Sequence, residues 1–203
     1  MTLGQLSLVD TELFQPTDGF DQDAWETPTW LAREFAGLVK PTEKRILEPA
    51  AGSGMVAQFL PLGTVCVEIK EDRVFEGTIR APQCHWHRQG FFSFEAEAPF
   101  DLVISNFPFS TAMLFIEKSL QLLDVTNPEA RILALLPTNF FQTQKVAKAF
   151  KTLGAHVHHK YEIVGRVAFL KQGVEKQGRQ CDDAIFDLRR GTDGDAISYL
   201  WRQ

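Results

Sequence analysis

Glu48-Pro49-Ala50-Ala51-Gly52-Ser53-Gly54 is the stretch that decides the fold, because it joins a strand-like segment to a glycine turn. The apolar run at 45–50 predicts a buried strand, and the segment from Met55 predicts the start of a helix. Glycines in such a turn let the backbone approach a ligand closely, next to a helix N-terminus. A G-x-G pattern alone fits a nucleotide-binding turn and a purely structural turn about equally well.

Strand-like and helical segments alternate along the rest of the chain. An amphipathic helix is expected after Trp25, with Thr27 as its cap and Pro28 at its first position. Further helices are expected from Glu71, at 110–123 and at 139–154, and strands at 64–69, 84–89, 100–106, 131–137, 156–165 and 183–190, with a similar pattern at 196–201. Apolar strands that alternate with helices indicate an α/β fold whose ligand lies beyond the carboxyl ends of the strands.

Length and composition predict one ordinary globular domain. The chain has 203 residues, of which 44% are hydrophobic and 23% charged, and we expect a single domain at 25–203 after a polar lead-in at 1–24. The three cysteines are too scattered for a disulfide framework, which favours a reducing cytoplasm. No apolar run is long enough to span a bilayer, and the first residues lack the features of a signal peptide, so a cytoplasmic protein without a membrane partner is expected.

Two further strand ends carry side chains with specific chemistry. Glu68 ends the second predicted strand, where an acid can bind the hydroxyls of a ribose; otherwise it is a solvated charge. Asn106-Phe107-Pro108-Phe109 ends the fourth. The Asn106 amide oxygen and the Phe107 carbonyl can both accept hydrogen bonds from one planar NH2 group, and the Phe109 ring offers a face on which a base can stack. The alternative is a simple turn with Phe109 in the core.

These stretches together resemble the class I amino-methyltransferases that use S-adenosylmethionine. The glycine turn, Glu68 and Asn106-Phe107-Pro108-Phe109 resemble motifs I, II and IV of that family, and Trp25-Glu26-Thr27-Pro28 resembles motif X. The resemblance covers about residues 25–190 and is greatest to the small adenine-specific DNA methyltransferases of phages and prophages. It implies a Rossmann-like fold with a largely parallel seven-stranded sheet, helices on both faces, and S-adenosylmethionine as cofactor.

The resemblance also assigns roles to individual residues. Thr27 is expected to hold the methionine end of the cofactor, and Asn106, Phe107, Pro108 and Phe109 are expected to form the catalytic turn. The other expected cofactor-binding residues are Glu48, Pro49, Ala50, Gly52, Gly54, Glu68, Ile69 and Phe91, together with Asn106 itself. The expected substrate-binding residues are Phe109, Lys145, Arg166 and Lys171, with 166–182 as a substrate-contacting loop. Lys145 is chosen not from the resemblance but from a stripe with Lys148 and Lys151 on the predicted helix, for which a solvated face is the alternative.

The sequence departs from the family pattern at two positions. Phe107 replaces the first of two prolines in motif IV, although its backbone carbonyl survives the change. The acid that motif III usually supplies to the adenine amine aligns with Gly90, beside Gln89, so Gln89 or a backbone group has to substitute. These changes leave a non-catalytic cofactor-binding subunit open as an alternative. Methylation of an RNA base or a protein glutamine is another, and a dinucleotide oxidoreductase is a third.

The net charge of −5 is divided unevenly along the chain. Residues 1–139 hold 10 basic and 19 acidic side chains, residues 140–180 hold 8 and 2, and residues 181–203 hold 3 and 5. The basic excess follows the predicted catalytic turn, which favours DNA as the partner through a one-sided, salt-sensitive contact.

The histidines at 85, 87, 156, 158 and 159 lie on predicted strands without nearby cysteines or acids, so no metal site is expected.

Overall fold

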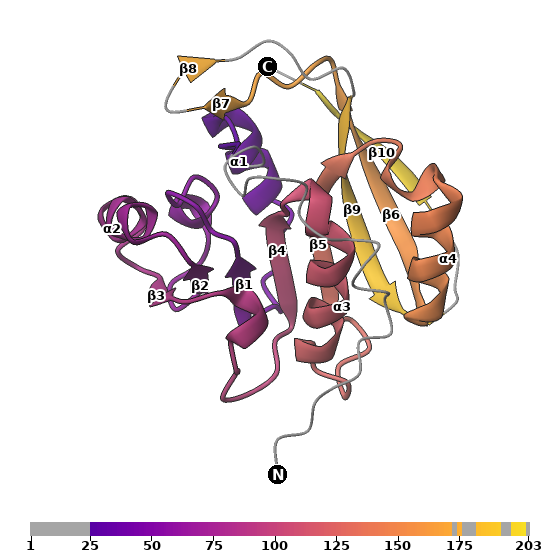
Figure 1. The fold of residues 1–203 in the computed structure, drawn as a ribbon, viewed down its shortest axis with the longest axis horizontal. Helices are drawn as coiled ribbons and strands as arrows, with labels where there is room; N and C mark the ends of the chain where they lie inside the picture. Colours follow the sequence, from indigo (N-terminus) through magenta and orange to yellow (C-terminus); the bar gives the residue numbers. More distant parts are fainter. Residues whose placement is uncertain (1–24, 172–173, 176–181, 192–195, 202–203) are drawn as a thin grey trace.

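An eight-stranded sheet forms the centre of the protein (Figure 1). The structure is a computed structural model that describes residues 25–171, 174–175, 182–191 and 196–201. The lead-in at 1–24 and positions 172–173 and 176–181 of the predicted loop at 166–182 therefore lie outside the described residues. The strand order is β10-β6-β9-β5-β4-β1-β2-β3. The strands are β1 (Ile46–Pro49), β2 (Val65–Glu68), β3 (His85–Arg88), β4 (Leu102–Asn106), β5 (Arg131–Pro137), β6 (Ala155–Val164), β9 (Asp183–Arg190) and β10 (Ala196–Trp201).

The sheet is mixed, and it has one strand more than the seven that were expected. Strand β9 pairs antiparallel with both β5 and β6, whereas the other paired strands of this sheet run parallel. Strand β9 begins at the edge where β6 ends, so it can return beside β6 without the long crossover that parallel pairing needs. The eighth strand, β10, adds to the outer side of β6. A separate short hairpin of β7 (Leu170–Lys171) and β8 (Val174–Glu175) lies near α1 at the top of Figure 1.

Helices cover both faces of the sheet, as expected. They are α1 (Thr29–Ala36), α2 (Glu71–Arg80), α3 (Ala112–Leu122) and α4 (Gln144–Thr152). Successive strand residues point to opposite faces, so Leu47 packs in the cluster with α3 and α4, whereas Ile46 packs in the cluster with α1. Cys66 lies in a third cluster beneath the end of α2. In the described part of the chain, no helix is long and apolar enough to cross a membrane.

Two local expectations near the glycine turn are wrong. The segment from Met55 forms only a short 3-10 helix, η2 (Ala57–Phe59), because Pro61 and the start of β2 at Val65 leave no room for a longer helix. No α-helix therefore follows the turn directly in the chain, since the next one, α2, begins at Glu71. Thr27 does not cap α1: the N-cap residue is Pro28, the helix begins at Thr29, and the Thr27 hydroxyl contacts Asn106 instead.

Candidate active site

A cavity of about 480 Å³ lies at the carboxyl ends of the first four strands. Strands β1 and β4 are neighbours here. The chain continues from β1 to β2 in one direction along the sheet and from β4 to β5 in the other. This reversal of strand order makes the site the topological switch point where α/β proteins bind ligands. Residues after each of the four strands line the cavity. They include Ala50 and Gly52 after β1, Glu68, Ile69 and Lys70 at the end of β2, Gln89, Gly90 and Phe91 after β3, and Asn106, Pro108, Ser110 and Thr111 at the end of β4.

Three residues of the glycine turn, at alternate positions, have a left-handed backbone conformation. Ala50 has φ 54°, Gly52 has φ 56° and Gly54 has φ 80°. Ala50 and Gly52 line the cavity, but Gly54 packs against the Gly77 backbone and the Trp86 ring, both of which lie within 3.4 Å of where a Cβ would stand. Gly54 is therefore placed in the packing beneath the turn and not in the cavity wall, and its cofactor-binding role stays a prediction. Pro49 does not line the cavity either, and its carbonyl accepts a hydrogen bond from the Ser105 hydroxyl.

Glu68 links the glycine turn to the end of β2. Its side chain is buried, and its two carboxylate oxygens accept backbone hydrogen bonds from Gly52 and Lys70, each at 2.9 Å. A carboxylate has lone pairs for about four hydrogen bonds, so it can accept further donors from a ligand. Ile69, which follows it, is 59% exposed at the cavity wall.

A smaller cavity of about 40 Å³ adjoins the first and contains Thr27 and Glu48. Two residues that sequence reasoning missed meet in it: Arg73 of α2 pairs with Glu26 at 3.2 Å, and the Ser53 hydroxyl donates to the same Glu26 oxygen at 2.7 Å. Glu26 lies in the motif X segment and Arg73 in a charged helix. Nothing in the sequence around either residue predicts this ion pair.

Glu48 is a buried acid in the small cavity. Burial, followed by the neighbouring Cys84 and Glu68, raises the pKa of Glu48 well above its ordinary value of 4.5. The Cys66 thiol lies 4.0 Å from its Oε2 atom. The side chain is therefore held as a neutral acid over a wider pH range than an exposed glutamate.

Asn106 lines both cavities. Its amide NH2 donates to the Trp25 carbonyl and to the Thr27 hydroxyl, both at 3.3 Å. Its Oδ1 atom is buried, and no described residue donates a hydrogen bond to it. A buried acceptor without a partner is costly, so this oxygen is suited to receive a donor from a ligand.

The aromatic residues divide between the core and the cavity. The Phe107 side chain is 1% exposed and packs on Phe115 in the core, so only its backbone can take part in the expected chemistry. Phe109 is half-buried and packs against the same core cluster. Phe91 does line the cavity, where its ring stacks on Phe115 with centroids 5.0 Å apart.

Of the expected substrate-binding residues, Phe109, Lys145 and Arg166 do not line the cavity. Lys145 is exposed on the first turn of α4, after β5, and Arg166 is exposed just after β6, so both follow strands that end at the same edge of the sheet. Lys171 lies in β7, and its side chain is outside the described residues. The neighbouring Leu170 forms two backbone hydrogen bonds with Glu26, which brings this segment next to the motif X residues.

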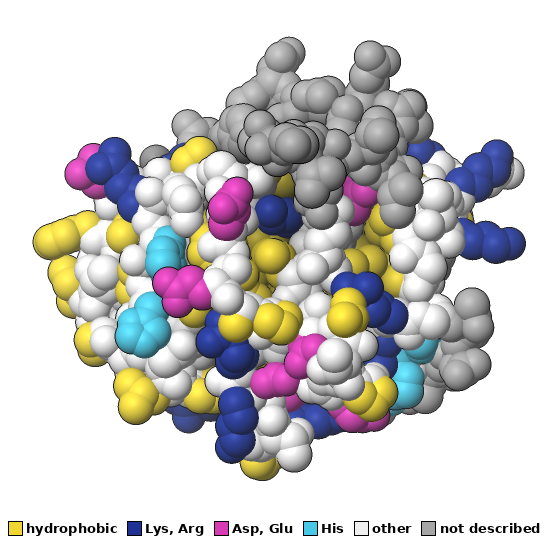
Figure 2. Space-filling view, turned by 90° about the horizontal axis from the view of Figure 1, so that it is seen from below, with side chains coloured by type: hydrophobic (Ala, Val, Ile, Leu, Met, Phe, Trp, Pro, Cys, Tyr) yellow, Lys and Arg dark blue, Asp and Glu magenta, His cyan; other side chains and the backbone are white. Residues whose placement is uncertain are grey.

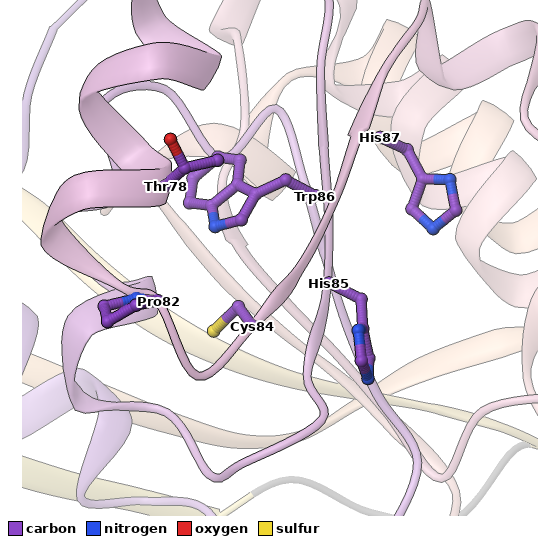
Figure 3. Close-up of a pocket in the computed structure, with 6 residues that line it drawn as sticks. All are labelled: Thr78, Pro82, Cys84, His85, Trp86 and His87. Carbon is purple, nitrogen blue, oxygen red and sulfur yellow. The ribbon is translucent and has the colours of Figure 1, made fainter.

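A second hollow, of about 560 Å³, lies between α2 and β3 and contains none of the expected site residues. Figure 3 shows Trp86 turned toward Thr78 of α2, with His85 and His87 on the other side of the strand. Within the described ranges, no group of three or more His, Cys, Asp or Glu side chains is placed to hold a metal ion.

Comparison with known proteins gives matches by structure. No protein-family model matches the chain, and no curated protein matches it by sequence. A Listeria monocytogenes protein assigned to the class I S-adenosylmethionine-dependent methyltransferases is 18% identical, with a TM-score of 0.66 over 91% of this chain and 68% of that one. A Pyrococcus horikoshii protein assigned as an RNA methyltransferase is 15% identical, with a TM-score of 0.64 over 89% and 97%. The glycopeptide N-methyltransferase MtfA, solved with S-adenosylmethionine, is 12% identical, with a TM-score of 0.58 over 81% and 95%. The chain therefore has the fold of the class I S-adenosylmethionine-dependent methyltransferases.

Proposed function

We propose that the chain is an S-adenosylmethionine-dependent methyltransferase that modifies the exocyclic amino group of adenine in DNA. The observation that carries the proposal is the buried Oδ1 atom of Asn106, which faces no donor among the described residues. It stands at the end of β4, beside a cavity built from the ends of β1, β2 and β3. An acceptor in that position suits a substrate that presents a planar NH2 group.

The residues around the cavity fit the proposed cofactor. Its volume of about 480 Å³ is in the range of about 300–1,000 Å³ that small-molecule sites occupy. Glu68 would accept hydrogen bonds from the ribose hydroxyls, and Ile69 and Phe91 would provide apolar walls for the adenine ring. The small adjoining cavity, with Glu48 and Arg73, offers polar groups to the amino acid end. When bound, the cofactor supplies a methyl group that is already activated by its positively charged sulfur.

The chain's own residues would prepare the acceptor. An exocyclic amine is a weak nucleophile because its lone pair is conjugated with the ring. Hydrogen bonds from the amine to Asn106 Oδ1 and to the Phe107 carbonyl would draw its hydrogens out of the ring plane and restore the lone pair. The nitrogen would gain the methyl group and lose a proton to water. Most of the acceleration would come from holding the nitrogen and the methyl carbon in line, about 3–3.5 Å apart.

The choice of DNA rests on the segments beyond the cavity. Lys145 and Arg166 follow strands that end at the cavity's edge of the sheet, where a nucleic-acid backbone would pass. An adenine in duplex DNA has to be flipped out to reach such a site, and the half-buried ring of Phe109, the last residue of the catalytic turn, would stack on that base. An RNA base or a protein glutamine presents the same NH2 group, and two of the similar structures are assigned to RNA and glycopeptide methylation, so these acceptors form the second candidate.

Radiolabelled methyl transfer to DNA, RNA and protein, assayed in parallel, tests the proposal. We expect label in the adenine of DNA, and none with the Asn106→Ala variant, while calorimetry shows that this variant still binds S-adenosylmethionine. Label in RNA or protein alone would replace the acceptor, and turnover by Asn106→Ala would overturn the role of this residue. No binding of S-adenosylmethionine by the wild type would overturn the proposal as a whole.

A further inference from the structure

The side-chain amide of Asn106 is held by the segment that precedes α1. Its Nδ2 atom donates to the Trp25 carbonyl oxygen and to Thr27 Oγ1, both at 3.3 Å, so both amide hydrogens have acceptors. Thr27 is only 3% exposed, although its hydroxyl does not cap the helix that follows. A buried hydroxyl at this position therefore serves the end of β4 rather than its own helix.

These contacts fix which way the Asn106 amide faces. If the amide turned over, its oxygen would lie against the Trp25 carbonyl oxygen, which can only accept hydrogen bonds. It would also present its NH2 group to the substrate NH2 group, so that two donors would meet. In the observed orientation, Oδ1 is buried on the other side, and no described residue donates to it.

The acceptors themselves are held in place on three sides. The backbone of Glu26 pairs with Leu170 through hydrogen bonds of 2.9 and 3.0 Å. The Glu26 side chain accepts hydrogen bonds from Ser53 at 2.7 Å and from Arg73 at 3.2 Å. The segment that orients Asn106 is thus fixed before any ligand arrives, which is how supporting residues keep a reactive group in a productive geometry.

We infer that Thr27 is a positioning residue that orients Asn106, and that this role takes the place of the cofactor-holding role implied by the family resemblance. The inference rests on the proposed function, because it assigns the orientation a purpose in transferring the methyl group. It predicts that removing the Thr27 hydroxyl slows transfer and leaves cofactor affinity almost unchanged.

Three threonine variants test the inference. Thr27→Val removes the acceptor with little change of shape, and Thr27→Ser keeps it. Thr64→Val is the matched control, since Thr64, just before β2, is 2% exposed and its hydroxyl donates to the Pro61 carbonyl. We expect Thr27→Val to lower kcat about tenfold or more, the size of effect expected for losing one hydrogen bond. The Kd for S-adenosylhomocysteine should stay within about twofold, and Thr27→Ser and Thr64→Val should keep most of the wild-type kcat.

The outcomes are separable. If Thr27→Val has a much higher Kd for S-adenosylhomocysteine and an unchanged kcat at saturation, Thr27 is a cofactor ligand and the inference is overturned. Wild-type values of both kcat and Kd in Thr27→Val would also overturn it.

If the wild type transfers methyl to no acceptor, the proposed function fails instead. The orientation can then still be measured from the side-chain amide NMR signals of Asn106. They should shift in Thr27→Val and not in Thr64→Val, and unchanged signals would overturn the inference. If Thr27→Val does not fold, Thr27→Ala removes the same acceptor with a smaller side chain.

Discussion

The backbone N–H of Gly52 donates a hydrogen bond of 2.9 Å to Oε2 of Glu68, a residue 16 positions further along the chain. The other carboxylate oxygen, Oε1, accepts from the backbone N–H of Lys70. Glu68, which resembles a ribose-binding acid, thus also connects the glycine turn to the end of β2 through hydrogen bonds. We therefore expect cofactor binding and local stability to be coupled in this residue.

Replacing Glu68 by alanine should therefore affect both properties. We expect the Kd for S-adenosylmethionine to rise at least about tenfold, and the free energy of unfolding to fall by about 1–3 kcal/mol, because two backbone donors lose their acceptor. Calorimetry and urea unfolding measure the two effects. Glu71→Ala is the control, because Glu71 forms an exposed pair with Arg88 and should change neither quantity much. Wild-type cofactor affinity in Glu68→Ala would remove Glu68 from the binding site.

Glu48 should make stability depend on pH. Its pKa is raised in the folded protein, so the unfolded chain loses this proton first as the pH rises above the ordinary value of 4.5. The folded state then binds more protons than the unfolded state, and stability falls with increasing pH until the folded pKa is passed. Glu48→Gln cannot ionise and escapes this loss.

We therefore expect Glu48→Gln to gain stability relative to the wild type as the pH rises from about 4.5, by at most about 1.4 kcal/mol per pH unit. Urea unfolding between pH 4 and pH 8 measures the difference. Glu76→Gln, at an exposed position of α2, is the control for replacing a carboxylate by an amide. A curve for Glu48→Gln that runs parallel to that of the wild type would contradict the raised pKa.

The strand positions could be predicted well because buried parallel strands are short apolar runs between turn residues. Strand β5 occupies the range 131–137 that its apolar run predicts, and β9 occupies 183–190. The helix after the glycine turn could not be predicted correctly, because the spacing to Pro61 matters more there than the apolar pattern. Strand β9 looks like any other strand in sequence, and its reversed direction follows only from where β6 ends.

The site could be predicted in part, namely at strand ends, since these meet wherever the sheet is parallel. Contacts between distant segments could not. Arg131 begins a strand that reads as apolar, yet its guanidinium is buried between Glu43 at 2.6 Å and Asp187 at 2.8 Å. Burial alone would lower the pKa of Arg131, but these hydrogen bonds raise it above its ordinary value. The same holds for the Glu26–Arg73 pair: the sequence shows that both residues are charged, but it does not show that they pair with each other.

Gly77 and Trp86 provide a test of the packing beneath the glycine turn. A Cβ on Gly77 would stand 2.2–2.6 Å from carbon atoms of the Trp86 ring, and the ring also touches Gly54 and donates from Nε1 to the Ala81 carbonyl at 3.2 Å. Alanine normally stabilises a helix relative to glycine, but here we expect Gly77→Ala to destabilise the protein by about 1–3 kcal/mol through overpacking. Thermal unfolding measures it, with Glu76→Ala on the same helix as the control.

A double variant distinguishes this clash from a general effect on α2. Adding Trp86→Leu should recover part of the stability that Gly77→Ala loses, so that the two effects are not additive. Strict additivity would show that the Trp86 ring is not what Gly77 accommodates.

Binding to DNA should depend on the basic residues at the cavity's edge of the sheet. Lys145 and Arg166 are exposed there, whereas Lys44 is exposed just before β1, at the opposite edge. Figure 2 views the molecule from that opposite edge and shows Lys and Arg side chains mixed with Asp and Glu, in keeping with pairs such as Lys40–Glu129. Only the cavity's edge is therefore expected to attract a phosphate backbone.

We expect Lys145→Ala and Arg166→Ala each to weaken binding to duplex DNA, and each to reduce the slope of log affinity against log salt concentration by about 1. Lys44→Ala should leave both quantities unchanged. Fluorescence anisotropy with a labelled duplex, titrated at several salt concentrations, measures affinity and slope together. Because a phosphate contact does not read sequence, the loss should be similar for duplexes of different sequence. Equal losses at Lys44 and Arg166 would mean that DNA binds without regard to the cavity's edge, and would remove the electrostatic argument for a DNA acceptor.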